Sequence, residues 1–169
     1  ALNRWLPLSI AVFDCEEADI DFHARYSCTS KEYIYKIWNT EVRNPFLDGY
    51  ALHYRYKLDE DMLNSAAQAY VGTHDFTSFC TLDSREKGDM TRTVKAFSVT
   101  REGNLVTMKV EADGFLYNMV RIMVGTLLRI QQGKIPVDGI AGIIEKKDRK
   151  FAGPTAQPCG LYLNRVNYD

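Results

Sequence analysis

The stretch GFLYNMVRIMVG, from Gly114 to Gly125, decides the layout of the chain and holds one arginine among apolar side chains. Its large apolar residues recur at helical spacing, which predicts a helix with one broad buried face. These residues are Leu116, Met119, Val120, Met123 and Val124. Arg121 lies at the centre of the run. Because a guanidinium keeps its proton, burial of Arg121 demands an acceptor, preferably a carboxylate.

That carboxylate is not found nearby in the sequence. No acid occupies positions 117, 118, 124 or 125, which share the helical face of Arg121. If the helix begins near Phe115, Glu111 and Asp113 lie about two turns away and point elsewhere. We therefore expect the acceptor to come from a distant part of the chain or from another molecule, unless the stem of Arg121 carries its charge to the surface.

Length and composition indicate one soluble globular domain. The chain has 169 residues, of which 46% are hydrophobic and 25% charged, and without a recognisable linker we treat residues 1–169 as a single domain. Neither a secretory signal nor a membrane-spanning helix is expected. The four cysteines form no C-x-x-C pair and the three histidines lack ligand spacing. This pattern predicts reduced thiols, a cytoplasmic location and no metal.

The charge distribution leaves nucleic acid open as a partner. The formal net charge is −1, which argues mildly against it. However, residues 1–21 hold one base and five acids, so removing their −4 leaves +3 for the remainder. Basic residues gather in two places, first at Arg85, Lys87, Arg92, Lys95 and Arg101, and again in KKDRK at 146–150. Such clusters are either phosphate contacts or, as the simpler interpretation of each one alone, solvated surface.

The pattern along the chain predicts an α+β fold. Period-two alternation predicts strands at 9–13, in two runs within residues 21–39, and at 93–100, 105–112 and 161–168. Helical spacing predicts helices from Asp59 to Gly72, from about Phe115 to Gln131, and after Pro136. The residues from Gly72 to Met90 are interpreted as a long loop. We expect a mostly antiparallel sheet with two or three helices packed on one face.

Two tyrosines in the predicted strand at 31–39 have different interpretations. Tyr33 and Tyr35 share one face, and for Tyr35 we accept a place in the core. Tyr33 is either a second core aromatic or part of a stacking platform for RNA, because Arg25 and Lys31 flank it.

The adjacent pair His74 and Asp75 suggests acid–base chemistry. Neighbouring residues, however, rarely present both side chains to one atom, and no nucleophile elbow or glycine-rich phosphate loop is present. We favour a structural pairing in a loop.

Several motifs, taken in order, resemble the tRNA pseudouridine synthase A (TruA-like) family. They are ALNRWLP, DFHARYSCTSKEYIYKIWN, GTHDFTSF, TRTV, GFLYNMVRIMVGTLL and TAQPCGLYL. The resemblance covers residues 1 to about 168, with a local departure at Gln157 and Cys159. A larger departure is that the family's G-R-T-D-x-G-V-H-A motif, which carries the nucleophilic aspartate and precedes ALN-x-x-LP, is not found in this sequence. By resemblance, this is the C-terminal part of the synthase without the preceding N-terminal domain.

The resemblance implies roles for two residues. The arginine of the M-V-R-x-x-V-G helix, which maps onto Arg121, pairs with the catalytic aspartate, and the tyrosine of the K-x-Y strand, which maps onto Tyr33, contacts the target base. These roles are physically reasonable. A guanidinium lowers the pKa of a carboxylate nucleophile, and a flipped uridine needs a flat surface and a hydroxyl within reach of a ring proton.

The implied reaction converts uridine to pseudouridine in the anticodon stem-loop of tRNA, without a cofactor, in a homodimer. The chain alone is then expected to be inactive, with RNA contacts from Arg25, Lys31, Arg85, Arg92 and Lys95. Two alternatives are a non-catalytic RNA-binding module and a protein-interaction domain that reuses the fold. Arg121 favours the enzyme, because neither alternative gains from an unpaired guanidinium in an apolar helix.

Overall fold

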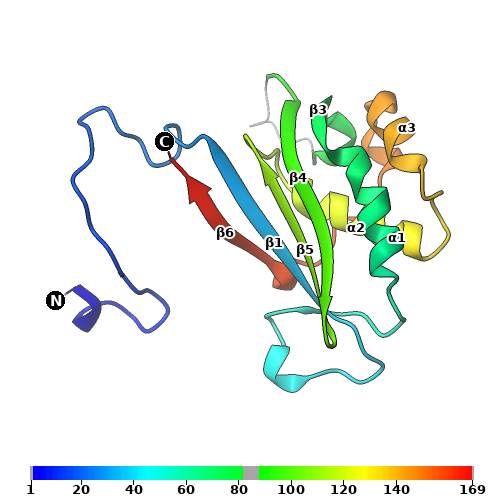
Figure 1. Ribbon diagram of the computed structural model, residues 1–169, viewed down its shortest axis with the longest axis horizontal. Helices are drawn as coiled ribbons and strands as arrows, with labels where there is room; N and C mark the ends of the chain where they lie inside the picture. Colours follow the sequence, from blue (N-terminus) through cyan, green and yellow to red (C-terminus); the bar gives the residue numbers. More distant parts are fainter. Residues whose placement is uncertain (1, 82–87, 169) are drawn as a thin grey trace.

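The computed structural model describes residues 2–81 and 88–168. One mixed sheet forms the centre, and its three α-helices lie together on one face (Figure 1). The strands are β1 (Ser30–Trp38), β2 (Leu52–His53), β3 (Gly72–Asp75), β4 (Thr91–Glu102), β5 (Leu105–Ala112) and β6 (Leu161–Asn167). The helices are α1 (Glu60–Ala67), α2 (Met119–Gln131) and α3 (Gly139–Lys146). The predicted α+β class, with helices on one face, is confirmed.

The strand order places β5 at the centre of the sheet, with β1 and β4 on either side of it. The path runs β2-β1-β5-β4-β3, and β6 pairs with the same edge of β1 as β2 does. Among the described strands, the β1–β2 pair alone is parallel, and the other pairs are antiparallel. The predicted hairpin is β4 and β5, which are in register from Glu102 opposite Leu105 to Val94 opposite Ala112, with a bulge between Val94 and Ala96.

The core lies between the helices and one face of the sheet. Tyr35 and Ile37 of β1 are fully buried and face Met108 and Val106 of β5. The α2 residues from Ile122 to Leu127 are buried as well. Tyr35 is therefore the core aromatic that the sequence predicts, and its hydroxyl donates to the carbonyl oxygen of Gln157 at 2.7 Å.

Helix α1 begins where the sequence predicts but ends earlier. Asp59 is its N-cap and accepts from the backbone nitrogen of Met62 at 2.9 Å. The helix ends at Ala67, and a 3-10 turn at Gln68–Tyr70 follows. Gly72 adopts a φ of +119°, and strand β3 starts there, so the prediction of a continuous loop from Gly72 was wrong for its first four residues.

The predicted start of α2 was also wrong. The helix begins at Met119, because Asn118 adopts a left-handed backbone conformation with φ 62° and ψ 7°. A residue in that conformation interrupts an α-helix. The four residues from Phe115 to Asn118 are thereby released from the helix and form one wall of a pocket.

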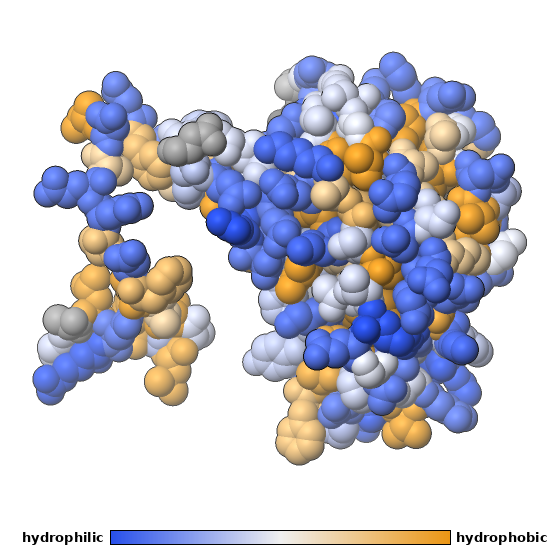
Figure 2. Space-filling model, in the orientation of Figure 1, coloured by the Kyte–Doolittle hydropathy of each residue, from blue (hydrophilic) through white to orange (hydrophobic). Residues whose placement is uncertain are grey.

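The first part of the 2–29 segment stands apart from the sheet and helices, and hydrophobic side chains are spread along it (Figures 1 and 2). Its last residues contact the end of β6, where the Phe22 and Tyr168 ring centroids lie 5.1 Å apart and the Thr29 nitrogen donates to the Asn167 carbonyl oxygen at 2.9 Å. The segment contains no strand, and Leu8, Phe13 and Ile20 are almost fully exposed. The strand predicted at 9–13 and the first of the two predicted between 21 and 39 were wrong. Strand formation needs a paired neighbour, and no described strand pairs with residues 9–13 or with residues 21–29.

Two glycines allow the chain after α3 to lie directly against α2. A Cβ atom at Gly125 would come within 1.7 Å of the Pro154 carbonyl oxygen, and one at Gly153 within 2.6 Å of the Gly125 backbone. The close approach carries residues 153–156 along the first half of α2, beside Arg121. Among the described residues, no helix is long and apolar enough to cross a bilayer.

Candidate active site

A pocket of about 290 Å³ opens where β1, β6 and the start of α2 meet. Tyr33 comes from β1, Leu161 from β6 and Arg121 from the first turn of α2, while residues 115–118 complete the lining. The volume is near the lower end of the range for small-ligand pockets, about 300 Å³. Tyr33 and Arg121, which the sequence places 88 positions apart, therefore line one cavity.

Tyr33 packs against the edge of the core and also lines the pocket. The ring meets that of Phe115 edge to face, with centroids 5.0 Å apart and planes at 82°. Burial raises the pKa of the Tyr33 hydroxyl, so this group stays protonated at neutral pH. The hydroxyl has no hydrogen-bond partner within residues 2–81 and 88–168, which leaves it available to a ligand.

Arg121 is anchored by two neutral oxygens. Its Nε donates to the Ala156 carbonyl oxygen at 2.7 Å, and its Nη1 donates to Asn118 Oδ1 at 2.9 Å. The Ala156 nitrogen donates in turn to the Arg121 carbonyl oxygen at 3.0 Å. In the described part of the chain, no carboxylate oxygen forms an ion pair with this guanidinium.

The distant acceptor that the sequence predicts for Arg121 is therefore Ala156, but it is a carbonyl and not a carboxylate. Arg121 is also partly exposed rather than buried. A positive charge thus lies at an otherwise aromatic and apolar pocket without a compensating negative charge among the described residues. Such a site favours an anionic group, and it would lower the pKa of any carboxyl group brought to it.

Comparison with known proteins identifies relatives of this chain. A family model described as tRNA pseudouridine synthase matches residues 66–169. A tRNA pseudouridine synthase A of Geobacillus sp. (strain WCH70) is 46% identical over 169 residues, which are 100% of this chain and 68% of the relative. The chain belongs to the tRNA pseudouridine synthase family.

Other relatives carry the same printed name. The tRNA pseudouridine synthase A of Acetivibrio thermocellus is 45% identical over 99% of this chain and 68% of its own length. That of Shewanella frigidimarina is 43% identical over 99% of this chain and 64% of its own length. The chain thus spans about two thirds of the length of these synthases.

Three of the predicted RNA-binding residues of this synthase chain lie near one end of the sheet, the end at which β1 and β4 begin. Lys31 pairs with Ala112 of β5, which also pairs with Val94 next to Lys95. Lys95 Nζ reaches the Thr29 carbonyl oxygen at 3.5 Å. Arg92 packs against Gly114, since a Cβ atom there would lie 3.4 Å from its side chain. Tyr33 follows Lys31 by two residues on the same face.

The other two predicted RNA-binding residues are Arg25 and Arg85. Arg25 is exposed in the segment before β1, with its guanidinium 5.6 Å from the centre of the Tyr26 ring. Arg85 lies outside the described residues. The structure thus brings together Lys31, Arg92 and Lys95, and leaves Arg25 on a separate segment.

His74 and Asp75 form local bonds within the fold. His74 Nε2 lies 3.2 Å from the Val71 carbonyl oxygen. Asp75 accepts from the Thr77 hydroxyl at 2.6 Å and pairs with Lys147 at 3.0 Å. These bonds lower the pKa of Asp75, with the Thr77 hydroxyl as the largest favourable contribution. The structural interpretation of this pair is supported, since both side chains bond to their own surroundings.

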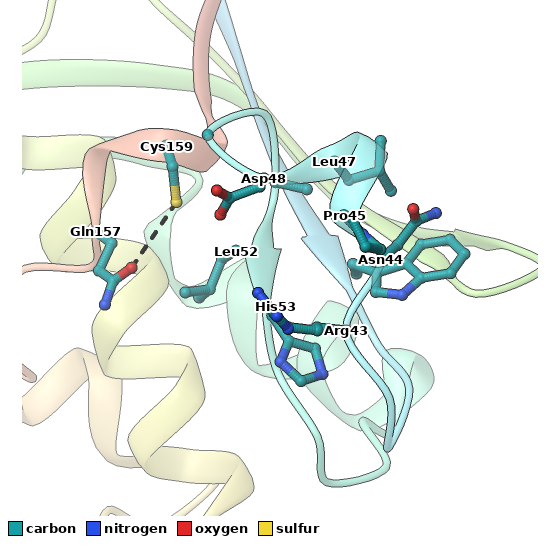
Figure 3. A pocket seen from close by; sticks show the side chains of 12 residues that line it. Arg43, Asn44, Pro45, Leu47, Asp48, Leu52, His53, Gln157 and Cys159 are labelled. Carbon is teal, nitrogen blue, oxygen red and sulfur yellow. Dashed lines mark hydrogen bonds between the residues drawn. The ribbon is translucent and has the colours of Figure 1, made fainter.

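A second and larger pocket, of about 500 Å³, lies beside the turn at Pro158–Gly160. Figure 3 shows the loop from Arg43 to His53 around it, with the Asp48 carboxylate turned toward Cys159. Two polar side chains of its lining form hydrogen bonds to the nearby backbone. Asn44 accepts from the Phe46 nitrogen, and His53 Nε2 lies 2.9 Å from the Thr40 carbonyl oxygen. This lining supports the loop, and the pocket contains neither Tyr33 nor Arg121.

Sequence reasoning missed Phe115, Asn118 and Ala156 as parts of the site. One signal was present, because an asparagine directly before the first apolar helical residue is a frequent helix start. The role of Ala156 has no sequence signal of its own. It depends on the close contact that Gly125 and Gly153 permit.

Proposed function

We propose that the pocket between Tyr33 and Arg121 receives the target uridine of a tRNA, and that this chain is the greater part of a tRNA pseudouridine synthase. The observation that carries the proposal is the shared pocket: a protonated phenol and an uncompensated guanidinium face one cavity of nucleobase size. The family membership supplies the substrate class and the reaction.

The reaction is an isomerisation, so no atom is gained or lost overall. The bond between ribose C1′ and uracil N1 breaks, the detached base turns, and a bond forms between C1′ and C5. The hydrogen at C5 leaves as a proton, and N1 gains one. An aspartate takes part covalently, and Arg121 keeps that carboxylate ionised at neutral pH because its positive charge lowers the pKa. Tyr33 offers the base a ring surface and a hydroxyl for hydrogen bonding.

The aspartate itself belongs, in our proposal, to an N-terminal domain outside these 169 residues. The family's G-R-T-D motif does not occur in the chain, and the relatives are about half as long again. On this proposal the chain alone is inactive. The enzyme works as a cytoplasmic homodimer on the anticodon stem-loop, and Arg25, Lys31, Arg92 and Lys95, together with Arg85, contact the RNA backbone.

The fold alone also suits a non-catalytic RNA-binding module or a protein-interaction domain. Arg121 argues against both, because its two anchors hold a charge at the pocket that neither role requires. An ordinary phosphate contact would be served by an exposed and flexible side chain.

The test measures tritium release from a tRNA transcript labelled at uridine C5. In the complete synthase, Arg121→Met is expected to lower turnover about a hundredfold or more, because removal of a preorganised charge commonly has that effect. Arg129→Met is the matched control. Arg129 lies in the last turn of the same helix, where its Nη1 donates to Gln132 Oε1 at 3.3 Å, and it does not line the pocket, so its loss should leave turnover unchanged. Full turnover by the Arg121→Met enzyme would overturn the proposal.

A further inference from the structure

Asn118 occupies a conformation that most residues avoid. Its φ of 62° makes it, with Lys147, one of two residues other than glycine that have a positive φ in the described part of the chain. Asparagine tolerates this region better than most residues, yet glycine adopts it at lower cost. A side-chain function at this position would explain why asparagine is present instead of glycine.

The Asn118 side chain bonds to Arg121 of the pocket on one side and to Thr81, which does not line the pocket, on the other. Its Oδ1 accepts from Arg121 Nη1 at 2.9 Å, and its Nδ2 donates to Thr81 Oγ1 at 3.3 Å. With the Nε–Ala156 bond on the other side, Arg121 is fixed at two separate atoms of its guanidinium. The rotation of a planar group held at two atoms is restricted, so its other N–H groups keep one direction.

The charge of these two anchors is as important as their position. Both are neutral oxygens, and each accepts from the guanidinium without cancelling its charge. An acidic anchor at 2.9 Å would form an ion pair instead, and the positive charge would no longer be available to a second carboxylate.

We propose that Asn118 is a positioning residue for Arg121, which holds the guanidinium toward the pocket by a neutral acceptor and so keeps its charge free for the catalytic aspartate. The inference rests on the proposed function of the pocket. It adds that the reaction requires a neutral amide at position 118, in a backbone conformation that glycine or aspartate also adopts.

Two substitutions separate this role from a structural one. Asn118→Gly keeps the left-handed backbone and removes the acceptor. Asn118→Asp keeps the shape, the backbone preference and the acceptor, but adds a negative charge. If asparagine were merely structural here, both substitutions would change the stability of the fold but leave kcat unaltered. We expect each to lower kcat about tenfold or more, since small misplacements of catalytic groups have effects of up to about a hundredfold.

The KM for tRNA should change less than about twofold in both variants, because phosphate contacts elsewhere supply most of the affinity. Thr81→Val is the matched control. It removes the partner of Asn118 Nδ2 but leaves the bond to Arg121 intact, so kcat should stay near that of the unchanged enzyme. All variants are made in the complete synthase, assayed by tritium release, and checked by thermal unfolding.

Arg121→Met, measured in the same series, separates the two proposals. If it retains turnover, the proposed function of the pocket is wrong. If it loses turnover while Asn118→Asp and Asn118→Gly keep theirs, the pocket assignment stands and the role of Asn118 is refuted. Should Asn118→Gly fold poorly, Asn118→Asp decides together with Thr81→Val. Aspartate keeps the shape and the acceptor of asparagine, and Thr81→Val accounts for the lost Nδ2 donor.

Discussion

The rings of Tyr33 and Phe115 meet edge to face at 5.0 Å, and the Tyr33 hydroxyl is left without a hydrogen bond in the described part of the chain. Tyr35 lies two residues further along the same strand, in the core. Its hydroxyl donates to the Gln157 carbonyl oxygen at 2.7 Å. The two tyrosines of β1 thus face the same side of the sheet with opposite hydrogen-bonding states. The Tyr33 hydroxyl is available to a ligand, whereas the Tyr35 hydroxyl stabilises the fold.

This contrast predicts opposite effects of the same substitution. Tyr33→Phe removes an unbonded hydroxyl, so the free energy of unfolding should change by less than about 0.5 kcal/mol. Turnover in the complete synthase should fall about a hundredfold, the usual scale for loss of a group that assists proton transfer. Tyr35→Phe should leave turnover much less affected but lower stability by about 1 kcal/mol, because the partly buried bond to the Gln157 carbonyl oxygen is lost.

Urea unfolding and tritium release, measured for both variants, test the pair. A stability loss for Tyr33→Phe equal to that of Tyr35→Phe would identify Tyr33 as a second core aromatic, which was the simpler interpretation of its spacing.

The Asp75 carboxylate should make the stability of the fold depend on acid pH. Bonds from Thr77 and Lys147 hold its pKa below the ordinary value of 3.8. The folded-state pKa is therefore lower than the unfolded one. The contribution to stability is fully present above about pH 4–5 and is lost as the pH falls through the folded-state pKa.

Asp75→Asn should accordingly destabilise the chain by about 1 kcal/mol at pH 7, a modest value because the pair is partly exposed. The difference from the unchanged chain should shrink below pH 4. Thermal unfolding at several pH values measures it, and a difference that stays constant down to pH 2.5 would show that the charge of Asp75 is irrelevant.

Local sequence patterns correctly predicted the elements whose stabilising partners lie close by in the sequence. The β4–β5 hairpin follows from strict alternation between Leu105 and Ala112, and the α1 start follows from Asp59 as an N-cap. The strand predicted at 9–13 has the same alternation. It fails because alternation describes a half-buried strand, and no described strand lies beside those residues to pair with it.

The prediction of the site from the sequence has the same limit, because local patterns do not reveal which distant segments come into contact. Family motifs single out Tyr33 and Arg121, and the structure brings both to one pocket. The anchors of Arg121 were not predictable in this way. Ala156 reaches it from 35 positions away, through a backbone contact that depends on two glycines. Asn118 reaches it because a single left-handed residue delays the start of the helix by one turn.

Phosphate contacts near the pocket should appear in the salt dependence of tRNA binding. Lys95 lies near the end of the sheet at which Tyr33 is found, and is exposed. Lys95→Ala should reduce the slope of log K against log salt by about 1, as expected for one lost phosphate contact. Lys134→Ala is the control, because Lys134 is exposed beyond the opposite end of α2. Filter binding at several salt concentrations measures both slopes, and equal slopes would exclude Lys95 from the RNA surface.

The contact between Gly125 and Pro154 should be essential for both stability and activity. An alanine Cβ at position 125 would lie 1.7 Å from the Pro154 carbonyl oxygen. Backbone atoms cannot yield as a flexible side chain does, so the 153–156 segment must move away from α2. Gly125→Ala should therefore destabilise the chain by about 3 kcal/mol or more. The displaced segment carries Ala156, whose oxygen anchors Arg121 Nε, so the complete synthase should lose turnover even where it stays folded.

Gly142→Ala is the matched control for that change. Gly142 lies in α3, is exposed, and has no atom within 4 Å of the added Cβ. Alanine is the better helix former, so this variant should be as stable as the unchanged chain or more stable by up to about 1 kcal/mol. Urea unfolding of the two variants compares one glycine required by a backbone contact with one that is not. Equal stabilities would mean that residues 153–156 do not pack against α2 in solution, and the anchoring of Arg121 by Ala156 would be lost with that contact.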